Sequence, residues 1–445
     1  MRKLNVRFEN EKDFEDWKAR HNLDLSKDTK ELNLVTGETT LRKKTNRKQK
    51  PGVYEERMQY WKEMPHYSST NVKPFAYIIM YFEDVKQVED LIEQEIKDST
   101  KSVYVPKRPL HRPFTYKRVL GGNEGPKYPI YVVSKNRPNN ATTSFHLSLM
   151  QVPHYIVVEP DQMEMYKKST LLDFNYAHLL EMDMSYYDNY DTFDDLGDTK
   201  GKGPGAARNF AWEHSMKMGY DYHWVFDDNA TGGFYMFDEN ERLKVRTGEI
   251  FRVMEEFVER FDNIGQAGLN YRMFISQDSK YAPFATNTRI YSFLFIRNDV
   301  PYRWRGRYNE DTDLSLRMLK DGWVTVQFNE FLAEKAKTQT VKGGNTEEFY
   351  AKEGTKAKSQ MLVDMHPDVA RLQYRFGRDH HYVDYSGFTQ QLHYRKGVED
   401  KLEDRFDNHG MKIVMTQEET GNRSNEKYRD ELEKLYNKEN QWHHF

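Results

Sequence analysis

From Tyr128 onward, short apolar runs alternate with amphipathic segments. The runs "PIYVVS", "HYIVVEP" and "YHWVFDDN" have the length of buried strands, and the intervening "TTSFHLSLMQ" and "GAARNFAWEHSMKMG" have helical spacing. The alternation continues through "RVMEEFVERF", "IGQAGLNY", "RIYSFLFIRND", "DTDLSLRMLKDG" and "WVTVQFNEF". Continuous apolar strands separated by helices are typical of a sheet that is buried on both faces. We therefore predict an α/β fold with a mostly parallel sheet and helices on both faces.

The N-terminal part has a different pattern, which occurs twice. Each copy begins with an alternating strand, continues into an amphipathic helix and ends in a returning strand. Phe8 matches Phe82 and Trp17 matches Leu91, both with an offset of 74 (82 minus 8, 91 minus 17). Asn10 is expected to cap the first helix. We predict two diverged βαβ modules, small α+β units related as an internal repeat.

Polar stretches that contain Gly and Pro predict the domain boundaries. "TLRKKTNRKQKPG" separates the two modules, and "LGGNEGPKYP" precedes the α/β part. The basic residues from Arg42 to Lys50 either keep this linker solvated or contact phosphate, and the sequence leaves both open. The predicted domains are a module at 1–50, a second module at 51–122, a core at 123–345, and a helical C-terminal extension with a tail at 346–445.

Composition limits the possible functions. The chain has 445 residues, 67 basic and 70 acidic, so a net charge of -3 argues against a uniformly basic nucleic-acid coat but permits a local basic groove. It has no cysteine, which excludes disulfides, zinc-thiolate sites and a cysteine nucleophile and fits a reducing compartment. No apolar run reaches the roughly 18 residues of a membrane span, and the start does not resemble a signal peptide. We expect a cytoplasmic protein without a membrane partner.

Polar side chains follow several of the predicted strands. In open α/β sheets, ligands bind at the carboxyl ends of the strands. Ser134 to Arg137 follow the first strand, Glu159 follows the second, and Asp227, Asp228 and Asn229 follow the third. Carboxylate and amide oxygens suit a hard divalent ion, which would leave coordination positions open for a diphosphate. An ordinary turn explains the same triplet.

Two further stretches carry candidate chemistry. In "RWRGRYNEDTDLSLRMLKDG", Glu310 and Asp311 open a helix; this is either an ordinary helix start or a site where a carboxylate takes a proton from an acceptor hydroxyl. In "GKGPGAARNFAWEHS", a Gly-rich loop opens a helix near Lys202 and Arg208, which favours phosphate binding but also suits a plain linker. The arginine-rich loop before Glu310 has the composition of a binding rim.

The order of these motifs resembles a known enzyme family. "KGKGPGAARNFAWEHSMKMGYDYHWVFDDN" is similar to the GT-A glycosyltransferase stretch that leads into the metal-binding DXD-type motif, and "YNEDTDLSLRMLKDGW" is similar to the later xED motif. Eight ordered motifs from about Tyr128 to Phe388 resemble the phage TET/JBP-associated glycosyltransferases: "YVVSKNRP", "YIVVEPDQ", "RNFAWEH", "HWVFDDN", "NTRIYS", "WRGRYNEDTDLSLRMLKDGW", "KGGNTEEFY" and "FGRDHHYVDY".

The resemblance implies a function and a site. It implies a GT-A-like, Rossmann-like core that moves a sugar from a nucleotide sugar, expected to be a UDP-sugar, to the hydroxyl of a 5-hydroxymethylpyrimidine in double-stranded phage DNA within the host cytoplasm. 5-Hydroxymethylcytosine is expected ahead of 5-hydroxymethyluracil, and Mn²⁺ or Mg²⁺ is the expected cofactor. The implied catalytic residues are Asp311 and Glu310, and the implied metal ligands are Asp227, Asn229 and His381. The implied nucleotide-sugar contacts are Ser134, Lys135, Arg137, Glu159, Lys202, Arg208, Asn209 and Asp228. The acceptor contacts are expected to be Arg303, Trp304, Arg305 and Arg307.

Other functions remain open on the sequence. A GT-A glycosyltransferase that acts on protein or glycan would use the same donor site with a different rim. A DNA-binding protein with an inactive core is the alternative from another class, with the N-terminal modules carrying its function. A metal-dependent nuclease would need more clustered acids and leaves the Gly-Ala-Arg-Asn helix unexplained. The sequence does not indicate an oligomeric state, the sugar that is moved, or whether the anomeric configuration inverts.

Overall fold

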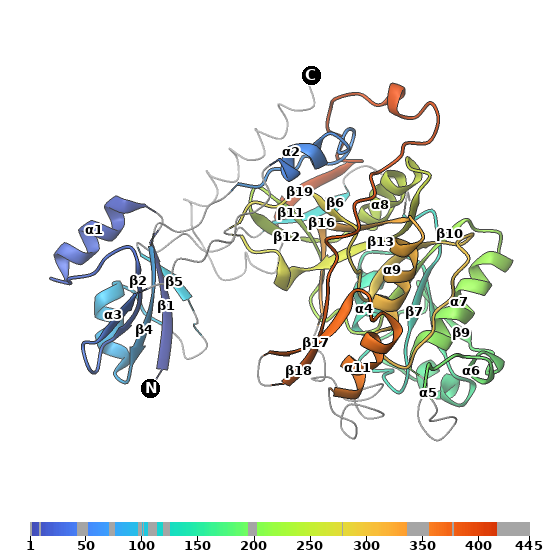
Figure 1. Cartoon of the computed structure of the whole chain (residues 1–445), viewed down its shortest axis with the longest axis horizontal. Coiled ribbons are helices and arrows are strands. Elements are labelled where there is room, and N and C mark those ends of the chain that lie inside the picture. Colours follow the sequence, from blue (N-terminus) through green and yellow to red (C-terminus); the bar gives the residue numbers. More distant parts are fainter. Residues whose placement is uncertain are drawn as a thin grey trace. The chain divides into compact units, whose positions relative to one another are not determined.

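The structure is a computed structural model that describes residues 2–8, 10–41, 52–70, 76–96, 100, 102–105, 114–118, 125–194, 203–277, 279–335, 356–375 and 378–415. The chain forms two compact units (Figure 1). The first consists of Met1–Val53, Ser69–Pro113 and Ser276–Lys280, and the second of Tyr54–Ser68, Phe114–Ile275 and Tyr281–Phe445. The basic linker at 42–50 and the tail from 416 onward lie outside the described residues.

The first unit is built around one five-stranded sheet in the order β3-β2-β4-β1-β5. Its elements are β1 (Arg2–Phe8), α1 (Glu11–Arg20), β2 (Thr29–Asn33), β3 (Thr39–Leu41), β4 (Ala76–Phe82), α3 (Val85–Ile92) and β5 (Ser102–Tyr104). The caps of the two helices correspond, since the side chain of Asn10 accepts from the N–H of Asp13, and that of Asp84 accepts from the N–H of Lys86. Each capping bond satisfies one N–H group that the first helical turn leaves unpaired.

The two predicted modules share this sheet. Strand β2, which follows α1, pairs with β4, whereas β5, which follows α3, pairs with β1. The central strands β1 and β4 are antiparallel, and their alternate residues are buried in one common core with the helices. Trp17 Nε1 donates to the carbonyl of Leu91, its repeat-equivalent position, at 2.6 Å. The repeats therefore form one unit with a split βαβ arrangement, where we had expected two separate domains.

The second unit contains the larger sheet and most of the helices. Its strands are β6 (Phe114–Arg118), β7 (Ile130–Val133), β8 (His154–Val158), β9 (Ala177–Glu181), β10 (Tyr222–Asp227), β11 (Gly233–Asp238), β12 (Glu241–Val245), β13 (Ile264–Tyr271), β14 (Phe284–Thr286), β15 (Phe293–Arg297), β16 (Val324–Glu334), β17 (Ala370–Arg375), β18 (Arg378–Val383) and β19 (Met411–Met415). Its helices are α2 (Val53–Met58), α4 (Thr142–Leu149), α5 (Met163–Lys167), α6 (Ser185–Asp188), α7 (Gly205–Lys217), α8 (Glu249–Glu259), α9 (Glu310–Lys320) and α11 (Lys356–Met365). Short 3₁₀ turns lie at Pro160–Gln162, Arg272–Phe274 and Glu399–Lys401.

The large sheet is mixed, which corrects the prediction of a mostly parallel one. Its order is β19-β6-β12-β11-β16-β13-β15-β10-β7-β8-β9, with β14 beside β16. Strands β10, β7, β8 and β9 are parallel, as expected, whereas β15 is antiparallel to both of its neighbours and β11 is antiparallel to β12 and β16. A tight turn forces the β11–β12 pairing, because Glu239 and Asn240 both have positive φ, the conformation that a two-residue hairpin requires.

Helices cover both faces of the sheet, as predicted. Trp224 and Phe226 of β10 pack in the core beneath α8 and α4, whereas Val225 points to the opposite face, where α7 and α9 supply the buried side chains. Such alternation with apolar residues on both sides is what a fully buried strand requires. Among the described residues, no helix has the length and apolar character needed to cross a bilayer.

Segments on both sides of the predicted core belong to the same unit. Trp61 and Met411 lie in the main hydrophobic cluster, and β19 pairs with β6 at the edge of the large sheet. The described part of the expected helical extension contains α11, but it continues into the hairpin β17–β18 and into β19. The pattern did not predict this hairpin, because most of the described residues of β17 and β18 are only partly buried and many of them are charged.

Gly268 lies where β13 passes close to β15, and it provides a test of this packing. A Cβ at this position would lie 2.2 Å from the carbonyl oxygen of Phe293, which is backbone and cannot give way. We expect Gly268→Ala to lower the free energy of unfolding by about 1–3 kcal/mol in urea denaturation. Gly265→Ala on the same strand is the control, because its nearest contact is the flexible Met318 side chain at 3.2 Å. Equal losses in both variants would contradict the prediction.

Candidate active site

One edge of the large sheet gathers the carboxyl ends of five strands. Strands β16 and β13 are parallel to each other, and so are β10, β7 and β8. Strand β15 lies between these two sets and is antiparallel to both β13 and β10. All five other strands therefore run in the same direction. Their ends line a cavity of about 410 Å³. Open α/β sheets bind ligands at this edge. The topology alone therefore brings together side chains that are more than 200 residues apart in sequence, from Ser134 to Lys335.

The starts of helices α7 and α9 complete the cavity wall. Helix α7 contributes Arg208 from its first turn, and α9 contributes Glu310 and Asp311 from its start. The charged side chains that line the cavity are Lys135, Arg137, Glu159, Arg208, Asp227, Asp228, Arg307, Glu310, Asp311, Lys335 and Lys358. Its uncharged polar and aromatic members are Ser134, Tyr187, Asn229, Tyr271, Phe274, Tyr291, Ser292, Asn309 and His381.

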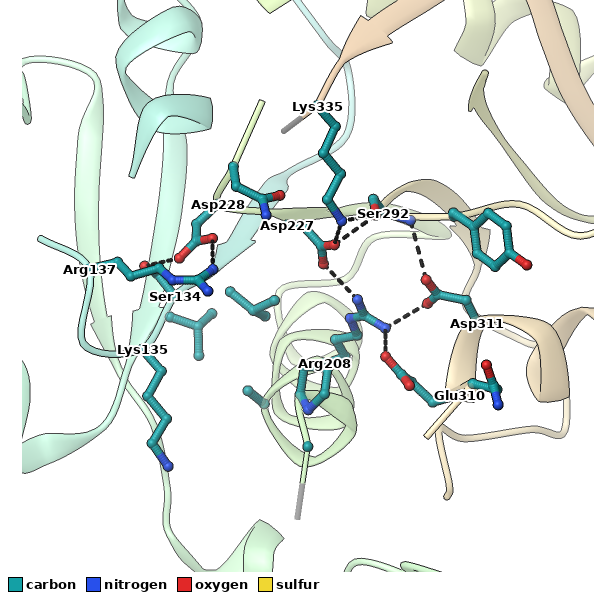
Figure 2. Close-up of a pocket in the computed structure, with 18 of the residues that line it drawn as sticks. Ser134, Lys135, Arg137, Arg208, Asp227, Asp228, Ser292, Glu310, Asp311 and Lys335 are labelled. Carbon is teal, nitrogen blue, oxygen red and sulfur yellow. Dashed lines mark hydrogen bonds and ion pairs between the residues drawn. The ribbon is translucent and has the colours of Figure 1, made fainter. Parts of the chain in front are cut away.

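Arg208 links the two acidic motifs that the sequence placed 83 residues apart (310 minus 227) (Figure 2). Its guanidinium donates to Asp227 Oδ1 at 2.7 Å, to Asp311 Oδ1 at 2.6 Å and to Glu310 Oε1 at 3.0 Å. The ring of Trp304 lies 4.6 Å from the guanidinium carbon and supports its other side. Burial alone would lower the pKa of Arg208, but the three carboxylates raise it, so this residue is a permanent cation. The predicted metal motif and the predicted base therefore face the same cavity.

Asp227 is held by two cations. Besides Arg208, it accepts through Oδ2 from Lys335 Nζ and from Ser292 Oγ, the latter at 2.7 Å. Burial would raise the pKa of Asp227, but Lys335 and Arg208 hold it well below its ordinary value. Asp227 is consequently an anion at neutral pH, and both of its oxygens are engaged.

Asp228 ties the loop after β7 to the end of β10. It accepts from Ser134 Oγ at 2.7 Å and from Arg137 Nη1 at 2.9 Å, and it is buried. Burial raises the pKa of Asp228, while Arg137 and Ser134 oppose that shift. Tyr166 OH also lies 2.6 Å from Ser134 Oγ and accepts from the N–H of Arg137 at 3.1 Å. These contacts fix the loop that was predicted to bind the nucleotide.

A second polar cluster forms at the carboxyl end of β8. Glu159 accepts from Lys135 Nζ at 3.0 Å, from Tyr187 OH at 2.8 Å and from Gln162 Nε2 at 3.1 Å. Lys135 and Tyr187 also line the cavity. An acid at this position of an α/β sheet can accept from the hydroxyl groups of a ribose. The cluster is therefore suited to the nucleoside end of a nucleotide sugar.

Asp311 has the electrostatic properties of a proton acceptor. Burial raises its pKa to about 7; Arg208 opposes this shift, whereas Glu310 and Asp227 add to it. Its Oδ1 accepts from Arg208, and its Oδ2 accepts from the backbone N–H of Ser292 at 3.3 Å. A carboxylate with a pKa near neutrality combines a usable deprotonated fraction with enough basicity to take a proton. Asp311 can therefore act as a general base at physiological pH.

Four predicted residues lie away from this cavity. Asn209, Arg303, Trp304 and Arg305 line a second cavity of about 590 Å³. Asn209 accepts from the N–H of Trp304 and donates to its carbonyl, so it positions the loop that supports Arg208. Arg303 pairs with Glu213, and Arg305 pairs with Asp313. Arg307 does line the main cavity, but it is buried and bound to Asp194. Lys202 lies outside the described residues.

Several members of the cavity were not predicted from the sequence. Lys335 was hidden because "WVTVQFNEF" ends at Phe331, whereas β16 continues to Glu334, so that Lys335 follows the true carboxyl end. The same rule that identified Asp227 would have found Lys335 with the correct strand length. Ser292 and Tyr291 precede the antiparallel β15, whose direction the pattern did not reveal. Lys358 comes from α11, and no local motif marks it.

The predicted metal ligands fit a divalent ion poorly as they stand. Among the described residues, no group of three His, Cys, Asp or Glu side chains is arranged to hold an ion. Asp227 is bound by cations on both oxygens, whereas Asn229 Oδ1 is buried and has no hydrogen-bond partner within the described part of the chain. His381 lines the cavity, and burial lowers its pKa to about 4, with Lys358 and Arg289 adding to the shift, so its imidazole is neutral. One open amide oxygen and one neutral ring do not make a metal site without displacing Lys335 or Arg208.

Comparison with known families identifies this part of the chain. Residues 128–344 match the model of the TET-associated glycosyltransferase family. These residues form a TET-associated glycosyltransferase domain. No curated protein matches the chain.

The TET-associated glycosyltransferase domain contains most of the cavity. All carboxylates of the lining lie within residues 128–344, as do Arg208 and Lys335. Lys358 and His381 lie beyond the domain, on α11 and β18. The family match implies glycosyltransferase activity. The described segment after residue 344 adds the side chains of Lys358 and His381 to the same cavity.

Proposed function

We propose that this chain moves a sugar from a UDP-sugar to the hydroxyl of a 5-hydroxymethylpyrimidine in DNA, with 5-hydroxymethylcytosine the preferred acceptor, and that its core is of the GT-A type. The observation that carries the proposal is the cavity in which Asp311, a carboxylate with a pKa raised to about 7, lies beside a cluster of fixed cations. Sugar transfer from a nucleoside diphosphate sugar requires a proton acceptor for the attacking hydroxyl, and positive charge that stabilises the leaving diphosphate.

The reaction can be written with the described groups. The acceptor hydroxyl oxygen forms a bond to the anomeric carbon of the sugar, and its proton passes to Asp311. The bond from that carbon to the diphosphate oxygen breaks, and its electron pair leaves with UDP. Developing positive charge on the sugar ring is stabilised by nearby carboxylates, as in glycoside hydrolysis. The products are the glycosylated base and UDP.

The donor end is assigned to the polar cluster around β7 and β8. Glu159 and Tyr187 offer hydrogen bonds to the nucleoside, and Lys135 offers a cation close to them. Arg137 and Ser134 are used mainly to hold Asp228. We therefore assign Lys135 and Glu159 direct contact with the donor and assign Ser134, Arg137 and Asp228 to the shape of the loop.

The acceptor end is assigned to the hairpin β17–β18. His381 of this hairpin lines the cavity, while Arg371, Arg375 and Arg378 are exposed, and Tyr374 has 74% of its surface exposed. Figure 1 shows the hairpin next to α11. Arginines that reach phosphates and an exposed aromatic ring are the side chains that bind a distorted nucleic acid. A nucleobase must flip out of the DNA double helix to reach the cavity, and in this proposal the hairpin holds the DNA strand while the nucleobase is flipped out.

The decisive experiment is a transfer assay. The protein is incubated with duplex DNA that contains 5-hydroxymethylcytosine, 5-hydroxymethyluracil or cytosine, together with a panel of UDP-sugars. Mass spectrometry of the nucleosides should find a hexose or pentose on the hydroxymethylated base and none on cytosine. Transfer to a protein or glycan, and not to DNA, would refute the proposed acceptor.

Removing charge from the hairpin should weaken DNA binding selectively. For the double variant Arg375→Ser with Arg378→Ser, we expect the KM for DNA to rise about tenfold with little change in kcat. The slope of log affinity against log salt should fall by about 2, because each lost phosphate contact contributes about 0.9. Lys167 and Lys217, two exposed lysines outside the cavity lining, provide a matched double control. An unchanged salt slope would exclude the hairpin from DNA contact.

A further inference from the structure

Lys335 occupies the place where the sequence predicted a metal ion. Its ammonium contacts Asp227 Oδ2 and lies 2.6 Å from Ser292 Oγ (Figure 2). An ammonium has three N–H donors, and these contacts use two of them. The side chain also lines the cavity, so the third donor can reach a ligand there.

The surrounding carboxylates are already neutralised by the protein. Arg208 takes the other oxygen of Asp227, and Ser134 and Arg137 take the two oxygens of Asp228. A divalent ion beside Asp227 would lie within a few ångströms of the Lys335 ammonium and the Arg208 guanidinium. Like charges at such distances repel strongly in a partly buried site, so the two cations oppose binding of a dication.

The charge of the whole cavity leads to the same conclusion. Its described lining contains six basic and five acidic side chains, so no surplus of negative charge is present to attract a dication. The basic members are Lys135, Arg137, Arg208, Arg307, Lys335 and Lys358, and the acidic members are Glu159, Asp227, Asp228, Glu310 and Asp311. A cavity with this balance is complementary to a ligand that brings its own negative charge, such as a nucleoside diphosphate.

We propose that Lys335 is the catalytic cation for the leaving nucleoside diphosphate, and that Asp227 holds its ammonium in place without binding a metal. The inference rests on the proposed sugar transfer. As the bond from the anomeric carbon to the diphosphate oxygen breaks, the electron pair remains on that oxygen, and Lys335 donates to it through the N–H that is not used by Asp227 or Ser292. Arg208 binds both Asp227 and Asp311 and offsets their mutual repulsion, so that one carboxylate can orient the cation while the other accepts the proton.

Binding of UDP to protein treated with EDTA tests the proposal without relying on turnover. In isothermal titration calorimetry, the wild type should bind UDP in EDTA. Lys335→Met should weaken binding at least about tenfold, as expected for loss of a charge-assisted contact, and Lys335→Arg should recover most of it. Lys167→Met is the matched control, since Lys167 forms an exposed ion pair with Glu164 on α5, and it should bind UDP like the wild type. Circular dichroism melting of each variant reports whether it is folded.

Asp227→Asn separates the two roles of the carboxylate. If Asp227 binds a metal, Mn²⁺ should strengthen UDP binding by the wild type but not by this variant. If Asp227 orients Lys335, the variant should bind UDP more weakly than the wild type, and to the same extent in Mn²⁺ and in EDTA. In the transfer assay, chelation should leave the wild-type rate unchanged, and Lys335→Met should lower kcat by about 10²–10³-fold, the usual loss when one charge-stabilising donor is removed.

The outcomes distinguish this inference from the proposed function. Transfer to hydroxymethylated DNA that EDTA abolishes, Mn²⁺ restores and Lys335→Met leaves unchanged would overturn the role of Lys335 and leave the proposed function standing. Metal-free UDP binding that depends on Lys335, without transfer to DNA, would support the role of Lys335 and refute the acceptor. UDP binding that occurs only with Mn²⁺ or Mg²⁺ would also overturn the inference.

Discussion

Replacing Asp311 by Asn should lower the kcat of sugar transfer by about 10²–10⁴-fold, the range by which a positioned general base accelerates proton transfer. The amide keeps an oxygen that can accept from Arg208, so the contact at 2.6 Å has a replacement and the fold should persist. UDP affinity should change little, because the lost function is proton transfer from the acceptor. Single-turnover transfer and UDP calorimetry on the same variant measure the two effects.

The pH dependence gives an independent check on the same residue. Asp311 acts as a base only when deprotonated, and its pKa is raised to about 7. The value of kcat/KM should therefore rise about tenfold per pH unit below 7 and level off above it. Glu310→Gln removes a negative charge that raises the pKa of Asp311, so the rising limb should move to lower pH while the plateau rate stays within a few-fold of the wild type.

Two results would contradict this assignment. Full transfer activity in Asp311→Asn would show that another group accepts the proton. A rising limb that does not move in Glu310→Gln would show that the limb reports a different titration. Loss of UDP binding in Asp311→Asn would indicate a structural effect, which thermal melting of the variant would detect.

The strands that carry the site could be predicted because they are buried on both faces. In the run that ends at Asp227, all five residues from Tyr222 to Phe226 are buried in the structure, and four of them are apolar or aromatic, with His223 the exception. Ser134 and Glu159 follow equally apolar runs. For such strands, the end of the apolar run is also the end of the strand, so the motif lies where the sheet edge binds ligands.

Sheet direction and side-chain pairing could not be predicted in the same way. Nothing in "RIYSFLFIRND" distinguishes an antiparallel strand from a parallel one, because periodicity records burial and not direction. The ion pairs of Arg208 depend on how α7 and α9 approach each other, and those contacts span about 100 residues. The arginines before Glu310 have the composition of a binding rim, yet Arg303 and Arg305 pair with Glu213 and Asp313 in the structure.

The repeat in the first unit illustrates the same limit. The matching of Trp17 with Leu91 revealed two related segments, but sequence similarity does not determine whether repeats fold separately or together. Each βαβ module alone would leave one strand edge and part of its apolar face exposed. Exchanging the returning strands buries both helices in one core, with β1 and β4 side by side at the centre. Hydrophobic burial therefore favours the single sheet.

Replacing Arg208 by Met should have the largest effect on stability. Arg208 is almost fully buried and bound to Asp227, Glu310 and Asp311. Its loss leaves these three carboxylates facing one another, and within the described part of the chain only Lys335, at Asp227, still forms an ion pair with them. Breaking a buried ion pair by removing one partner costs about 3–5 kcal/mol. We expect a loss of this size in the free energy of unfolding, measured by urea denaturation, together with loss of sugar transfer.

The cause of that loss can be identified with three controls. Arg252→Met removes a partly exposed pair with Glu256 and should cost less than about 1 kcal/mol. The double variant Arg208→Met with Asp311→Asn should recover part of the stability, because one uncompensated charge is gone. The difference from the wild type should also shrink as the pH falls below about 7, because the pKa of Asp311 is already raised to about 7 and protonation removes its unpaired charge. If the loss in the free energy of unfolding does not depend on pH and is not reduced by Asp311→Asn, Arg208 stabilises the fold mainly by packing against Trp304 and not by its charge.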